Sequence, residues 1–169
     1  MLRFLFRRLT NEPPRGQQLF DAVVGEARQP DWYTAGGVPD TLDGRFAMLA
    51  TVCALVTVRL DSEADGAVIS AALTERFIEA MDAEHRQLGL NDPTLGKRVR
   101  KMVGVLSRRV GEWRAVIAAD GDWGAAARSS VYRGGDMSDT QLDFTVGRLR
   151  DLWSRLVRAS GSALMEGRF

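Results

Sequence analysis

Apolar residues recur along this chain at the three- and four-residue spacing of helices and almost nowhere alternate with the period of two that is typical of strands. Six helices are predicted, at about residues 16–28, 41–60, 66–88, 92–119, 123–132 and 138–160. Pro30 ends the first helix, because proline cannot continue the hydrogen-bond ladder. Asp92-Pro93 starts the fourth, and Gly161 closes the sixth. The pattern predicts an all-α fold, a single-domain bundle of about six helices.

The segment at 41–60 is the most apolar part of the chain, and both of its sides carry large apolar residues. A helix that is apolar almost all round usually lies at the centre of a bundle. Its uncharged run, 46–58, is well short of the ~20 residues that a membrane-spanning helix needs. We therefore expect a buried core helix, in which Cys53 packs and does not react, since burial raises the pKa of a thiol.

The turn before this helix, at 31–46, combines glycine, proline, aspartate, arginine and aromatic residues. Gly36-Gly37 follows no predicted strand, so a phosphate-binding turn is not indicated, and these glycines are expected to let the backbone turn sharply. Thr41 or Asp43 is expected to cap the next helix. Arg45 lies on its first turn, where a positive charge opposes the helix dipole. We expect Arg45 either to pair with a carboxylate, such as Asp40, Asp43 or one from another helix, or to contact a partner.

Composition limits the classes of function. The chain has 169 residues, a formal net charge of +1 and one cysteine. One domain is expected, intramolecular disulfides and thiolate metal clusters are excluded, and a reducing compartment is the default. The small net charge provides no general attraction for nucleic acid, so specific DNA binding is not expected. Residues 1–15 mix arginines with large apolar side chains and are expected to form a separate segment, flexible or in contact with a membrane, before a helical domain at 16–169.

Candidate chemistry is sparse. His85 is the lone histidine and is expected on the surface near a helix end. Asp61 and Asp65 have a spacing that a magnesium-dependent isoprenoid enzyme would use, but no second acidic motif accompanies them. No catalytic residue, metal site or cofactor is therefore assigned.

A basic group lies on the predicted helix at 92–119. Its members are Lys97, Arg98, Arg100, Lys101, Arg108 and Arg109. Two interpretations are open: a solvated helix face, or a docking surface for an acidic protein, RNA or anionic lipid.

Several collinear motifs between residues 19 and 132 resemble the ubiquinol-cytochrome c chaperone family. They are Trp32-Tyr33, Gly37-Val38-Pro39-Asp40-Thr41, Gly44-Arg45-Phe46, Met81-Asp82, Gly96-Lys97-Arg98-Val99, Lys101-Met102 and Val131-Tyr132. The resemblance implies a bacterial, non-enzymatic assembly factor for the cytochrome bc1 complex. Such a protein would lie in the cytoplasm, peripherally at the cytoplasmic face of the inner membrane. Its client would be cytochrome b or another bc1 subunit.

Such a chaperone needs an apolar or amphipathic groove for the client and a basic face for the ribosome or an anionic membrane. We expect the turn and the basic helix face to provide these surfaces. The expected partner-binding residues are Trp32, Tyr33, Val38, Pro39, Asp40, Arg45, Phe46, Lys97, Arg98, Lys101 and Tyr132. Two other classes remain as alternatives: a helical carrier that binds lipid or quinone, and, less favoured, an isoprenoid-processing enzyme.

Overall fold

The computed structural model describes the backbone of residues 16–87 and 95–169 and the side chains of residues 16–83 and 100–169. These residues form eight helices and no strand: α2 (Gln17–Ala27), α3 (Pro30–Tyr33), α4 (Leu42–Leu60), α5 (Gly66–Gln87), α6 (Leu95–Ala118), α7 (Trp123–Ser130), α8 (Asp139–Arg158) and α9 (Gly161–Met165). The predicted all-α bundle is confirmed. The N-terminal segment at 1–15 and the side chains of His85, Lys97 and Arg98 lie outside the described residues.

Two short helices were not predicted. Pro30 was expected only to end a helix, but it also occupies the first turn of α3. Gly161 was expected to close the last long helix, whereas α8 ends at Arg158 and Gly161 begins α9, which Ser160 caps through the Ala163 amide at 3.2 Å. Helices of one turn are too short to show a hydrophobic period, which explains why the pattern missed them.

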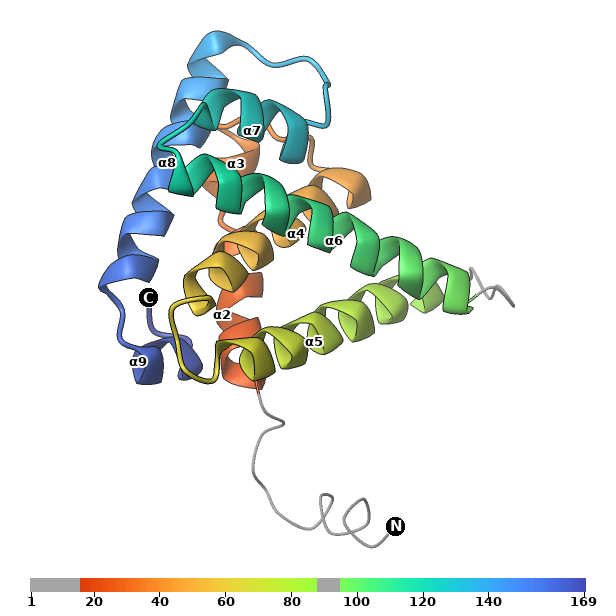
Figure 1. The fold of residues 1–169 in the computed structure, drawn as a ribbon. Coiled ribbons are helices and arrows are strands. Elements are labelled where there is room, and N and C mark those ends of the chain that lie inside the picture. The colour runs from red at the N-terminus through yellow and green to blue at the C-terminus, as the bar shows by residue number, and fades with distance from the viewer. Residues whose placement is uncertain (1–15, 88–94) are drawn as a thin grey trace, which may run out of the picture.

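The predicted central helix is α4. It contacts α2, α5, α6, α7 and α8, and Figure 1 shows it enclosed by them. Apart from its first turn, nearly all of α4 is buried, on both of the sides that the sequence marked as apolar. Cys53 is fully buried, and desolvation raises the pKa of its thiol above the ordinary range. The core of the protein is therefore built around α4, as its composition indicated.

The structure corrects the expected basic face of α6 at one position. Arg100, Lys101 and Arg108 are exposed, but Arg109 is only 5% exposed and its Nη2 donates to the Ser130 carbonyl oxygen at the end of α7, 2.7 Å away. Burial, reinforced by the nearby positive charges of other arginines, lowers the pKa of Arg109 to about 10. Arg109 therefore joins α6 to α7 and takes no part in a surface patch.

Candidate partner-binding site

The turn between α3 and α4 is held by close backbone packing that only glycine allows. Gly37 has a φ of +63°, in the left-handed region. A Cβ atom on Gly36 would lie 2.8 Å from Thr145 Oγ1 on α8, and a Cβ atom on Gly44 would overlap the Pro39 carbonyl oxygen. The expected sharp turn is thus present, and it lies directly against α8.

Tyr132, which follows α7 and is distant from this turn in the sequence, holds the turn in place. Its side chain is buried, and its hydroxyl donates to the Gly36 carbonyl oxygen at 2.5 Å. The same hydroxyl lies 2.8 Å from Thr145 Oγ1 and 3.1 Å from the Gln141 carbonyl oxygen. Burial raises the pKa of Tyr132, and the hydrogen bond with Thr145 opposes this shift. One phenol thus joins the turn to α8.

Trp32 and Val38 also hold the turn from inside. Trp32 is fully buried, its indole Nε1 donates to the Glu26 carbonyl oxygen at 2.8 Å, and the Arg148 guanidinium lies 5.3 Å from its ring centroid. The amide of buried Val38 donates to the Trp32 carbonyl oxygen at 3.1 Å. In this conformation the buried side chains of Trp32, Val38 and Tyr132 shape the turn. That they contact a partner stays a prediction.

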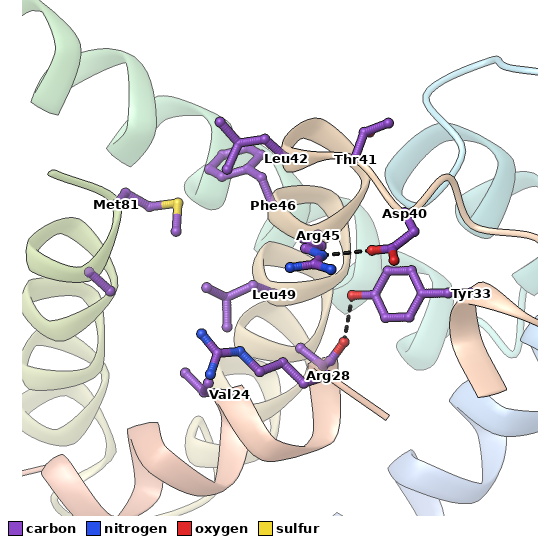
Figure 2. Close-up of a pocket in the computed structure, with 12 residues that line it drawn as sticks. Val24, Arg28, Tyr33, Asp40, Thr41, Leu42, Arg45, Phe46, Leu49 and Met81 are labelled. Atoms are coloured by element: carbon purple, nitrogen blue, oxygen red, sulfur yellow. Dashed lines mark hydrogen bonds and ion pairs between the residues drawn. The ribbon is translucent and has the colours of Figure 1, made fainter. Parts of the chain in front are cut away.

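A groove with a volume of about 360 Å³ opens beside the turn, between α2, α4 and the far end of α5 (Figure 2). Its lining is divided by chemistry. The apolar members are Val24, Ala27, Leu42, Phe46, Leu49, Ala80 and Met81. The polar members are Arg28, Tyr33, Asp40, Thr41 and Arg45. Leu42 is 43% exposed at the edge of the groove, which is unusual among the large apolar side chains that the structure describes.

Arg45 forms the ion pair with Asp40 that was one of the two expected alternatives, and its contact with a partner stays a prediction. Its Nε lies 2.7 Å from Asp40 Oδ1, and both side chains remain largely exposed, at 64% and 59%. The hydrogen bond from Arg45 lowers the pKa of the Asp40 carboxyl group. Thr41 is the residue that caps α4, accepting from the Gly44 amide at 3.2 Å. Arg45 is thus paired within the turn and is also accessible from solution.

Tyr33 connects the turn to α2. Its hydroxyl donates to the Ala27 carbonyl oxygen at 2.8 Å. The pKa of Tyr33 is raised because the side chain is partly buried, and the positive charges of Arg45 and Arg28 oppose this shift. Arg28 was not among the expected site residues. The one available signal was its place before Gln29-Pro30, since a cation is favourable at the C-terminal end of a helix.

The structure brings only part of the expected set together. Tyr33, Asp40, Arg45 and Phe46 line one groove. Phe46 also packs on Phe77, with ring centroids 5.7 Å apart. Pro39 is exposed but does not line the groove, and Lys101 is exposed on α6.

Other kinds of site find little support in the part of the chain that the structure describes. Its residues contain no group of three or more histidine, cysteine, aspartate or glutamate side chains able to hold a metal ion. Asp61 accepts two hydrogen bonds from Arg114, at 2.7 and 3.1 Å, so it is engaged in a link between α4 and α6. None of the described helices has the length and apolar character needed to span a membrane.

Comparison with known proteins adds two findings. A family model described as ubiquinol-cytochrome C chaperone matches residues 34–169. The crystal structure of the Cbp3 homolog from Brucella abortus is similar, with a TM-score of 0.76 and 25% sequence identity, over 99% of this chain and 94% of that chain. A search of curated proteins found no match. The family match includes the α4 and α5 sides of the groove, whereas Val24 on α2 and Arg28, which follows α2, precede the matched residues.

Proposed function

Because this chain belongs to the ubiquinol-cytochrome C chaperone family, we propose that it is a non-enzymatic assembly factor that binds cytochrome b, or another bc1 subunit, in the groove beside α4. The observation that carries this proposal is the groove itself. It combines an apolar side, which a segment of a membrane protein needs, with a polar side formed by Tyr33, Asp40 and Arg45. Segments of partner proteins commonly bind by placing their apolar side chains in an apolar groove between helices.

The rigidity of the turn supports the same proposal. Binding costs less when the surface is already ordered, because fewer side chains and loops lose freedom on association. Here Tyr132 and Gly36 join the turn to α8, and Thr41 caps the helix that follows. The Asp40–Arg45 pair is therefore presented from a preformed edge.

The exposed basic residues of α6 would provide a second contact, with the ribosome or an anionic membrane surface. Arg100, Lys101 and Arg108 are exposed. Such a contact would place the protein in the bacterial cytoplasm, at the cytoplasmic face of the inner membrane. Each basic residue near an anionic membrane contributes about 1 kcal/mol of attraction.

The test compares bc1 assembly in cells that carry single variants. Leu42→Asp and Arg45→Ala should lower the amount of assembled complex and the recovery of cytochrome b with the protein in mild detergent, with little change in thermal stability, because both side chains are exposed. Lys97→Glu combined with Lys101→Glu tests the basic face. The matched control is Val157→Asp, since Val157 is an exposed apolar residue of α8, at 53%, that does not line the groove.

Normal assembly in both groove variants would refute the proposed client site. Normal assembly in the double lysine variant would refute the proposed second contact alone.

A second candidate is a lipid or quinone carrier, which the seven apolar lining residues favour. Native mass spectrometry of the purified protein separates the two. A bound lipid or quinone would support the carrier, and a protein without such a ligand would support the chaperone.

A further inference from the structure

The charges around the groove are not balanced by the described residues that line it. Arg28 and Arg45 carry positive charges there, and Asp40 carries the one negative charge of that lining. Asp40 pairs with Arg45 at 2.7 Å. Arg28, in contrast, forms no ion pair with any carboxylate in the described parts of the chain. The groove therefore holds one arginine whose charge the described lining does not match.

The position of Arg28 suits a binding role. It is the residue that follows α2, where the negative end of the helix dipole favours a cation. Figure 2 shows its side chain extending from the end of α2 below Leu49, beside Val24. The aliphatic part of an arginine can cover apolar surface while the guanidinium stays in water. Arg28 and Arg45 both line the groove, Arg28 from the end of α2 and Arg45 from the first turn of α4.

We propose that the groove binds an amphipathic helical segment of the client, whose apolar side chains contact Leu42, Phe46 and Met81 and whose carboxylate pairs with Arg28. This inference rests on the proposed client-binding function and names the chemistry of the bound segment. A guanidinium group donates two parallel hydrogen bonds to a carboxylate, which gives direction as well as energy. An amphipathic helix places apolar side chains three or four positions apart, which suits a groove between helices.

An anionic lipid also combines negative charge with apolar chains, but the lining suits it less well. Recognition of anionic lipid headgroups uses clusters of several basic residues. The described lining has two arginines, and one of them is already engaged by the exposed carboxylate of Asp40, which would repel a phosphate. A single carboxylate requires only Arg28.

The test measures binding of two fluorescently labelled synthetic peptides to the full chain by anisotropy at low salt. Both peptides are amphipathic helices with a leucine face, and they differ only in a glutamate or a glutamine at the edge of that face. The glutamate peptide should bind wild-type protein roughly two- to fivefold more tightly, as expected for one accessible charge pair. The ratio should fall to about one in Arg28→Gln.

The matched control is Arg158→Gln, which should keep the preference for glutamate. Arg158 is an exposed arginine at the end of α8, so it resembles Arg28 in its place on a helix, but it does not line the groove. Circular dichroism checks that each variant is folded.

Equal binding of the two peptides, a preference that persists in Arg28→Gln, or no binding of either peptide would each overturn the proposal. Binding to phosphatidylserine vesicles that depends on Arg28, without competition by the glutamate peptide, would overturn it in favour of a lipid. Failure of the proposed client site itself would be seen separately, as normal bc1 assembly in both Leu42→Asp and Arg45→Ala.

Discussion

Replacing Tyr132 by phenylalanine removes one oxygen atom from the contact that joins the turn to α8. The Gly36 carbonyl oxygen, which accepts from the Tyr132 hydroxyl at 2.5 Å, then loses its partner in a buried position. Thr145 is affected less. Its hydroxyl can donate to the Gln141 carbonyl oxygen one turn earlier in α8, a common arrangement for threonine in a helix.

The free-energy cost of Tyr132→Phe is therefore that of one buried hydrogen-bond acceptor without a partner. Such a group costs about 1–3 kcal/mol, and we expect a loss of about 2 kcal/mol in the free energy of unfolding. For a domain of this size, each kcal/mol corresponds to roughly 2–4 °C in Tm, so Tm should fall by about 4–8 °C. Tyr33→Phe is the matched control. The Ala27 carbonyl oxygen that Tyr33 contacts borders the groove, where water can replace the lost bond, so we expect a cost below about 1 kcal/mol.

Thermal and urea unfolding, followed by circular dichroism, measure both variants. Hydrogen exchange at the Val38 amide, which donates to the Trp32 carbonyl oxygen, reports opening of the turn. We expect faster exchange there in Tyr132→Phe than in Tyr33→Phe. Equal losses of stability in the two variants, with unchanged exchange at Val38, would refute the argument that Tyr132 holds the turn.

Three further predictions concern stability. Gly44→Ala should lower the free energy of unfolding by roughly 2–3 kcal/mol in urea, because the new Cβ atom overlaps a backbone oxygen. Gly147→Ala, in an open position on α8, should instead raise it by about 0.5–1 kcal/mol. A similar loss of stability in both variants would contradict this prediction. The raised pKa of Tyr132 means that the fold favours the neutral phenol, so this contribution is present below pH 10 and is lost as the pH rises through the folded-state pKa. Stability measured against pH should therefore fall less steeply above pH 10 in Tyr132→Phe than in wild type, and parallel curves would refute the assignment. A double-mutant cycle on Asp61 and Arg114 should give a coupling free energy below about 1 kcal/mol, because both side chains are about half exposed, at 46% and 50%. A much larger coupling free energy would contradict this prediction.

The sequence predicted most of the helices because their signals are local. Apolar spacing, proline and glycine positions and the capping box at Ser138 all act within about four residues, and the structure has a capping box between Ser138 and Gln141. The central place of α4 followed from the apolar character of both its sides. The sequence also limited the cap of α4 to Thr41 or Asp43, and local geometry selected Thr41.

The candidate site was only partly predictable, because side-chain direction depends on packing. The motif containing Val131 and Tyr132 contributed to the family resemblance, yet nothing in the local pattern indicated that the Tyr132 hydroxyl meets the Gly36 carbonyl oxygen, 96 positions away in the chain. Arg109 looked like a member of a basic face, but the packing of α7 against α6 buries it. No local signal linked Arg28, which follows α2, with Met81 on α5, although both line one groove.

The sequence by itself determined the helical class, the central helix, the turn that only glycine permits and the family to which the chain belongs. The tertiary structure alone decided which residues of the turn are buried supports, which line a groove, and that Arg45 pairs with Asp40 while remaining exposed. The physical reason is the range of the forces involved. Helix formation and capping depend on neighbours along the chain, whereas a groove and the charges that face it exist only after distant helices have packed together.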